Sequence, residues 1–76
     1  MKELLEFVVR SLVDRQDAVV ITEVTGGAQP VYKISVAEGE VGKIIGRQGR
    51  TVKAIRAVAA AMERKTGQRA VVEIAE

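Results

Sequence analysis

Residues 41–56 read VGKIIGRQGRTVKAIR, and this stretch decides the fold. At its centre is the tetrapeptide Gly46-Arg47-Gln48-Gly49, in which two residues separate two glycines. Because glycine has no Cβ, the backbone can turn sharply there and approach another chain closely. Apolar residues at helical spacing stand on both sides of the tetrapeptide. The stretch therefore predicts a short helix, a tight GxxG turn and a second helix.

The charge around this turn is one-sided. Residues 41–62 contain five basic side chains and no acid, whereas the rest of the chain has seven basic and ten acidic residues. The net charge of the whole chain is only +2, because the acids outside residues 41–62 offset the positive charge of this stretch. Such a field steers a polyanion to one face. The start of the second helix adds unpaired N–H groups and a positive dipole end, which suit a phosphate. Together these features predict a clamp for a nucleic-acid backbone.

Composition removes several classes of function. The chain has no cysteine and no histidine, which excludes disulfides, thiolate chemistry, zinc-finger spacing and histidine acid–base catalysis. The pair Gly42-Lys43 is followed by Ile44 instead of serine or threonine, so the P-loop pattern fails. No nucleophile paired with a base is apparent. We therefore expect a protein that is not an enzyme, with no catalytic residue, metal, cofactor or small-molecule substrate.

Length and hydropathy indicate how many domains the chain forms and whether it spans a membrane. Seventy-six residues form one small domain that hides only about 60–65% of its unfolded surface, so its stability is marginal unless a partner adds burial. No apolar run approaches the ~20 residues that span a bilayer, and no signal peptide is visible at the start. We expect a cytoplasmic protein without a membrane span.

Hydrophobic periodicity predicts the remaining elements. The expected helices are 2–14, 41–45 and 50–65, and the expected strands are 18–25, 31–36 and 69–74. Glycines mark the hairpin turn at 26–30 and the end of the long helix at Gly67. The predicted fold is α+β, a single domain of residues 1–76 with the order α-β-β-α-α-β. Its helices pack on one face of a three-stranded mixed sheet, in which we expect the last strand to lie beside the first.

The GxxG stretch resembles the signature of KH domains, which bind single-stranded nucleic acid. The matching residues are Ile44, Ile45, Gly46, Arg47, Gln48, Gly49, Val52 and Ile55. The isoleucine pair, the basic residue inside the loop and the apolar pair after it make the match more specific than a bare GxxG. The resemblance covers essentially the whole chain. An order that starts with a helix is that of the bacterial KH domains, usually called type II.

This resemblance implies a groove between the two helices joined by the loop and the edge of a strand. The nucleic-acid-binding residues would be Gly46, Arg47, Gln48, Gly49, Lys43, Ile44, Ile45, Arg50 and Lys53. The loop would hold the sugar–phosphate chain, the flanking basic residues would approach phosphates, and one isoleucine of the pair would form an apolar wall for the bases. The other isoleucine should lie in the core, and the sequence leaves open which one. With only one phenylalanine, one tyrosine and no tryptophan, base stacking is limited, so we expect weak and loosely sequence-specific binding.

The long helix carries apolar residues on two sides. One stripe packs the helix on the sheet and consists of Val52, Ile55, Ala59 and Met62. The other stripe lies roughly opposite and consists of Ala54, Ala57, Val58 and Ala61. Small residues allow a second helix to approach closely, so we predict that the second stripe is a dimer interface. The alternative is that alanine is simply a good helix former at exposed positions.

Single-domain KH chains of this size are similar to the small bacterial KhpA (YlqC) family. The resemblance implies a cytoplasmic protein that binds single-stranded RNA and acts as an RNA chaperone or post-transcriptional regulator. It also implies a homodimer, or a heterodimer with a larger KH protein of the KhpB (Jag) family, and a link to cell-envelope homeostasis, cell length and cell shape. Two alternatives stay open: a protein-interaction adaptor with a KH fold, and a single-stranded DNA binder, since the loop contacts only the backbone.

Overall fold

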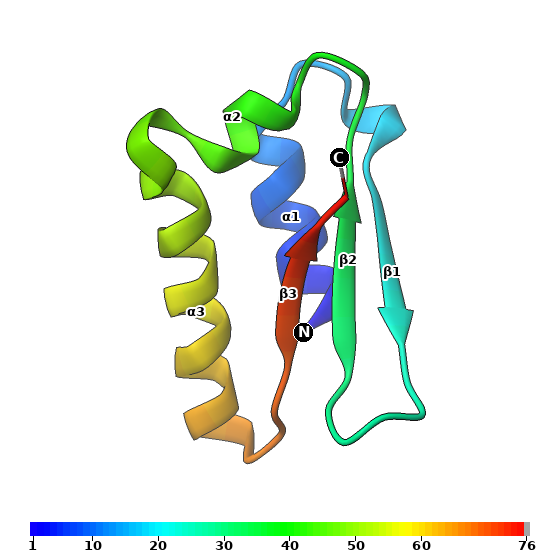
Figure 1. Cartoon of the computed structure of the whole chain (residues 1–76), viewed down its shortest axis with the longest axis vertical. Coiled ribbons are helices and arrows are strands. Elements are labelled where there is room, and N and C mark those ends of the chain that lie inside the picture. Colours follow the sequence, from blue (N-terminus) through cyan, green and yellow to red (C-terminus); the bar gives the residue numbers. More distant parts are fainter. Residues whose placement is uncertain (76) are drawn as a thin grey trace.

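The computed structural model describes residues 1–75. Its elements (Figure 1) are α1 (Lys2–Leu12), β1 (Val20–Val24), β2 (Val31–Ser35), α2 (Val41–Ile45), α3 (Arg50–Thr66) and β3 (Val71–Ile74). Two 3-10 turns, η1 (Gln16–Ala18) and η2 (Arg47–Gly49), stand between them. The predicted order α-β-β-α-α-β is confirmed, and element ends differ from the prediction by no more than two residues.

The sheet has the strand order β1-β2-β3. β1 pairs antiparallel with β2, and β2 pairs parallel with β3. The prediction that the last strand lies beside the first is therefore wrong, although the sheet is mixed as expected. β3 follows β2 through the helical crossover formed by α2 and α3, and consecutive strands are usually neighbours in space. The N–H of Val71 bonds to the carbonyl of Pro30 at 2.9 Å and extends this pairing.

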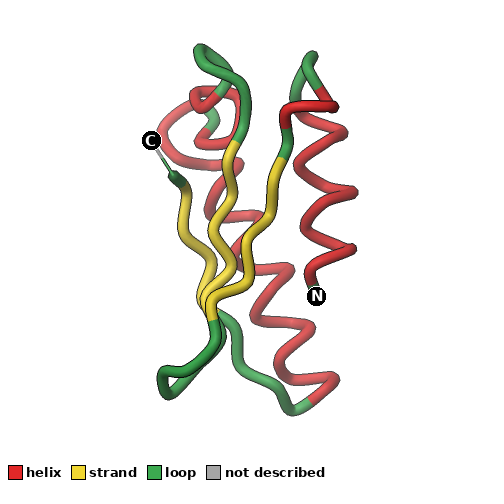
Figure 2. Tube along the Cα trace, turned by 90° about the vertical axis from the view of Figure 1, so that its right-hand side faces the viewer, coloured by secondary structure: helices red, strands yellow, loops and turns green. Residues whose placement is uncertain are grey.

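Figure 2 shows α1 and most of α3 on one face of the sheet, as predicted, whereas α2 lies near one end of the strands (Figure 1). Strand residues that point to this face are buried, among them Ile21, Ile34 and Val72. α1 contributes Leu5 and Val9 to the same core. The opposite face of the sheet is uncovered, and the valines there are partly or well exposed. The single core therefore sits between the sheet and the helices.

α3 is a 17-residue helix that uses only part of its surface for the core. Val52, Ile55 and Ala59 are buried, as the first predicted stripe requires, and Met62 is half-buried. The helix ends at Gly67, which has φ 77° and donates its N–H to the carbonyl of Glu63 at 2.8 Å. Within residues 1–75, no helix combines the length and the apolar character that crossing a membrane demands.

Candidate nucleic-acid interface

The GxxG loop is a tight turn held by three backbone hydrogen bonds, one of which joins the N–H of Arg50 to the carbonyl of Arg47. The N–H of Gly46 bonds to the carbonyl of Gly42 at 2.8 Å and ends α2. The N–H of Gly49 bonds to the carbonyl of Gly46 at 3.1 Å and closes the turn. Gly46, Gln48 and Gly49 have φ values of 75°, 57° and 73°. α3 then begins at Arg50, so the loop opens directly onto a helix N-terminus.

The two glycines of the loop are required for different reasons. A Cβ on Gly46 would overlap the hydroxyl of Thr51 and lie 2.9 Å from its backbone nitrogen. At Gly49 there is room, since the nearest atom is 4.0 Å away on Val52, but the left-handed backbone disfavours a side chain. Between them, Gln48 is the only non-glycine residue with positive φ in residues 1–75. Strained residues of this kind concentrate at functional sites.

The loop and the first turn of α3 present free cationic groups. Arg47, Arg50 and Lys53 are exposed, and the salt bridges formed within residues 1–75 involve none of them. Gly49, the N-cap of α3, has no side chain to cap the helix, so the first N–H groups of the helix lack a side-chain partner. The N–H of Arg50 already bonds to the carbonyl of Arg47. A phosphate at this corner would meet the other N–H groups of the first turn, the positive end of the helix dipole and the nearby guanidinium groups.

The two isoleucines before the loop have different surroundings. Ile44 is 0% exposed and belongs to the hydrophobic core. Ile45 is half-buried at the surface. The inclusion of Ile44 among the nucleic-acid-binding residues is therefore corrected, because a fully buried side chain cannot contact a ligand. Ile45 is the member of the pair that is available as an apolar wall.

Lys43 stands one turn before the loop, and its amine is already paired. Its Nζ donates to Oδ2 of Asp14 at 2.5 Å and lies 3.4 Å from Oε2 of Glu40. The contact with Asp14 raises the pKa of Lys43 above its ordinary value. Lys43 thus differs from the other basic residues near the loop, and its place on the phosphate path stays a prediction.

Glu40 contacts Lys43 and also binds the backbone of the segment that carries Asp14. Its carboxylate accepts the backbone N–H groups of Asp14 at 2.6 Å and Arg15 at 2.9 Å. The bond from Asp14 is the largest cause that lowers the pKa of Glu40. Glu40 is the buried charged residue in the described part of the chain. No local sequence signal could reveal these partners, because they lie 25 and 26 residues away in the chain.

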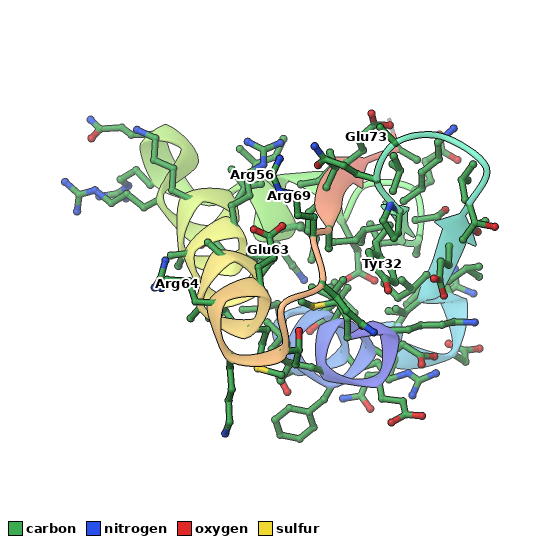
Figure 3. All side chains as sticks on the ribbon, turned by 90° about the horizontal axis from the view of Figure 1, so that it is seen from below. Tyr32, Arg56, Glu63, Arg64, Arg69 and Glu73 are labelled. Atoms are coloured by element: carbon green, nitrogen blue, oxygen red, sulfur yellow. The ribbon has the colours of Figure 1, made fainter. Side chains whose placement is uncertain are left out.

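A groove lies between α3 and β3, which is an edge strand of the sheet. It has a volume of about 250 Å³, and its lining includes Arg56, Ala60 and Val71. Glu63 also lines the groove, and its carboxylate accepts the N–H of Ala70 at 2.5 Å. Figure 3 shows Arg56 and Glu63 on α3, on the side near β3. The groove is thus lined mainly by small apolar side chains, together with Arg56 and with Glu63, whose carboxylate is already hydrogen-bonded to the backbone.

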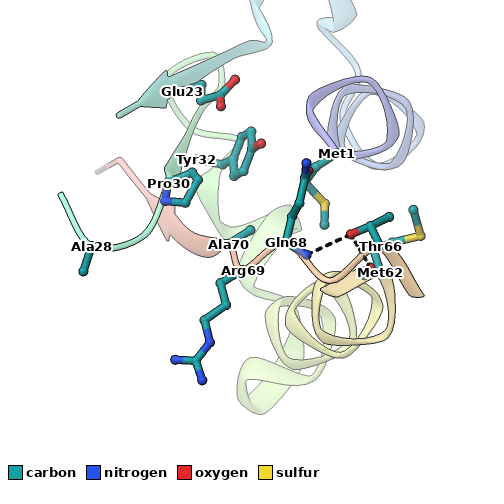
Figure 4. A pocket seen from close by; sticks show the side chains of 10 residues that line it. All are labelled: Met1, Glu23, Ala28, Pro30, Tyr32, Met62, Thr66, Gln68, Arg69 and Ala70. Atoms are coloured by element: carbon teal, nitrogen blue, oxygen red, sulfur yellow. Dashed lines mark hydrogen bonds between the residues drawn. The ribbon is translucent and has the colours of Figure 1, made fainter. Parts of the chain in front are cut away.

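A second hollow lies at the other end of the molecule. It measures about 490 Å³ and is formed by the end of α3, the start of β2 and the N-terminus (Figure 4). Tyr32 and Met62 contribute to its lining. Because α3 begins at the GxxG loop and ends at this hollow, the two features lie a helix length apart. The hollow is therefore separate from the GxxG loop.

These features define a KH domain: two helices joined by a GxxG loop and packed on a three-stranded mixed sheet. Residues 2–74 match the family described as KhpA/KhpB, KH domain. The chain belongs to this family, which is not a family of enzymes.

Relatives match along almost their full length. The chain is 49% identical over 74 residues to the RNA-binding protein KhpA of Clostridium acetobutylicum, covering 97% of this chain and 99% of the relative. It is 42% identical to the RNA-binding protein KhpA of Chlamydia muridarum, covering 100% of this chain and 97% of the relative. For the RNA-binding protein KhpA of Aquifex aeolicus the identity is 41%, and the coverage is 100% and 96%. No solved structure matches the chain significantly.

Proposed function

We propose that this protein binds single-stranded RNA through its GxxG loop. The observation that carries the proposal is the loop geometry: Arg47 and Gln48 stand exposed between two constrained glycines, at the uncapped start of α3. A backbone that a ligand can approach closely, the positive end of a helix dipole and a guanidinium suit a sugar–phosphate chain. The names of the relatives as RNA-binding proteins favour RNA over single-stranded DNA.

The strand would run from the loop into the groove between α3 and β3. Arg47, Arg50 and Lys53 would contact phosphates, and Ile45 would face the bases near the loop. Two to four phosphate contacts correspond to a log–log salt slope of roughly −1.4 to −3 for a single strand. With small aliphatic groove walls in place of aromatic rings, each base gains little from stacking. The domain alone would bind weakly and with little base preference.

Pairing of chains would compensate for weak binding, because two linked sites share an effective concentration. Ala54, Ala57, Val58 and Ala61 are all exposed in this structure, as an interface for a second chain requires. The proposed assembly is a homodimer or a heterodimer with a KhpB (Jag)-family protein. The proposed role is that of a cytoplasmic RNA chaperone or post-transcriptional regulator linked to the cell envelope, cell length and cell shape.

Fluorescence anisotropy with a labelled single-stranded RNA, measured across a salt series, tests the proposal. The double variant Arg47→Asp/Gln48→Asp should abolish binding and keep the fold, since both side chains are exposed and aspartate tolerates the left-handed conformation. Arg64→Asp/Gln68→Asp is the matched control, with the same change of composition and charge at the far end of α3. The control should keep most of the parent's affinity.

The alternatives give different results in the same experiment. If the parent fails to bind RNA even at low salt, the protein-interaction adaptor becomes the better account. Equal losses in the loop variant and in the control would show that only net charge matters and would contradict a GxxG site. Competition with DNA of the same sequence separates RNA binding from general single-strand binding.

A further inference from the structure

Lys43 is the only one of the five basic residues in 41–62 that forms a salt bridge within the described residues. It lies on α2, three residues before Gly46. Its partners come from outside the basic stretch: Asp14 from the connection after α1, and Glu40 from the residue before α2. Residues 41–62 contain no acid, but the fold places Asp14 and Glu40 against Lys43 near one end of this stretch.

The two acids hold Lys43 unequally. Both oxygens of Glu40 are occupied by backbone N–H groups at 2.6 and 2.9 Å, and its contact with Lys43 is the longer one, 3.4 Å. Asp14 makes the short bond to Lys43, and its own side chain is 86% exposed. An exposed ion pair contributes only about 0–1 kcal/mol. The Asp14–Lys43 pair is therefore weak enough to exchange when another anion, such as a phosphate, arrives.

We propose that Asp14 competes with RNA for the amine of Lys43 and thereby lowers the affinity of the GxxG face. The inference rests on the proposed function, because it concerns the strength of that same site. A phosphate that reaches Lys43 has to displace a carboxylate of equal sign, so the exchange yields little net gain. Without Asp14, the same contact would add to binding. The carboxylate of Asp14 thus occupies the amine of Lys43 in place of a phosphate of the RNA.

A double-mutant cycle tests this by the anisotropy measurement with single-stranded RNA. Asp14→Ala should tighten binding about two- to fivefold, as expected for one gained surface ion pair, and should steepen the log–log salt slope by about 0.7. Lys43→Gln alone should change affinity less than twofold. Asp14→Ala/Lys43→Gln has the net charge of the parent and should return to the parent's affinity.

Asp17→Ala is the matched control, because Asp17 is exposed, lies three residues further on in η1 and forms no salt bridge in residues 1–75. If Asp17→Ala tightens binding as much as Asp14→Ala, the effect is one of overall charge and the proposal is overturned. A gain that survives in Asp14→Ala/Lys43→Gln also overturns it. These outcomes leave the GxxG site intact, whereas RNA binding by Arg47→Asp/Gln48→Asp equal to the parent's overturns the proposed function itself.

Discussion

At the scale of single residues, Gly42 and Gly46 have opposite structural requirements although they lie four positions apart. Gly46 adopts φ 75°, and its α-hydrogen faces Thr51 so closely that a methyl group would overlap it. Gly42 lies inside α2, and a Cβ there would meet nothing within 4 Å. The backbone carbonyl of Gly42 accepts the bond from Gly46, a role that any residue can fill. One glycine is therefore required by the turn and the other is not.

Alanine substitutions should separate these roles. Gly46→Ala should destabilise the protein and displace the loop, because Thr51 and the start of α3 must move to admit the methyl group. Gly42→Ala should stabilise it, by less than the about 0.5–1 kcal/mol that separates alanine from glycine in a helix interior, because Gly42 lies in the first turn of α2. Thermal unfolding of the two variants and the parent measures whether the melting temperature falls for Gly46→Ala and rises for Gly42→Ala. Equal stability of Gly46→Ala and the parent would contradict the steric account of the loop.

At the scale of elements, Glu40 ties the connection after α1 to the start of α2. The two backbone N–H groups that it accepts belong to Asp14 and Arg15, where no helix or strand pairs the chain. α2 itself has only five residues, too few to be stable alone. The position of the GxxG loop thus depends on a buried carboxylate that holds two segments together.

This contact makes stability depend on pH at the acid end. Folding lowers the pKa of Glu40, so its contribution is present above its ordinary value of about 4.3 and is lost as pH falls through the lower folded value. Glu40→Gln should lower the melting temperature clearly at pH 7, and the difference from the parent should shrink as the pH is lowered below that range. Thermal unfolding monitored by circular dichroism at several pH values measures the difference.

Glu38→Gln provides the control, because Glu38 is exposed two residues earlier and is absent from the hydrogen bonds and salt bridges formed by described side chains. Its melting temperature should follow that of the parent at every pH. A difference between Glu40→Gln and the parent that stays constant down to the acid limit would show that Glu40 acts by shape and not by charge.

At the scale of the whole molecule, the sheet and its helices leave one side of α3 without a partner. Val58 is 40% exposed, and the three alanines of the same stripe are exposed around it. Exposed single alanines need no explanation, whereas a valine among them on a helix already packed through its other side favours contact with another chain. The stripe as a dimer interface remains a prediction.

Ala61→Lys should give monomers at concentrations where the parent is a dimer, because a two-fold interface would place each lysine near its symmetry mate or in an apolar contact. The fold should persist with a stability change within about 0.5 kcal/mol, as expected for an exposed site. Sedimentation velocity measures the assembly state. Phe7→Lys is the control, since Phe7 is 71% exposed on α1, and this variant should remain dimeric. Dimers that persist in both Ala61→Lys and Val58→Lys would exclude the stripe.

The sequence by itself determined the features that depend on neighbours within a few residues. The six elements, the GxxG turn and the end of α3 at Gly67 follow from hydrophobic periodicity and from the backbone freedom of glycine, both of which act over short windows. The two apolar stripes of α3 follow from helical geometry in the same way. The family signature could be recognised for this reason, since its residues occupy one continuous stretch of the chain.

Only the tertiary structure decided the features that depend on residues far apart in the chain. β3 lies beside β2 and not beside β1, Ile44 and not Ile45 is in the core, and the amine of Lys43 is paired with a carboxylate 29 residues away. Adjacent isoleucines in a short helix are equivalent by composition, and they differ only through what packs against each. A count of charges along residues 41–62 likewise misses Asp14, because electrostatic pairing depends on distance in space and not on distance along the chain.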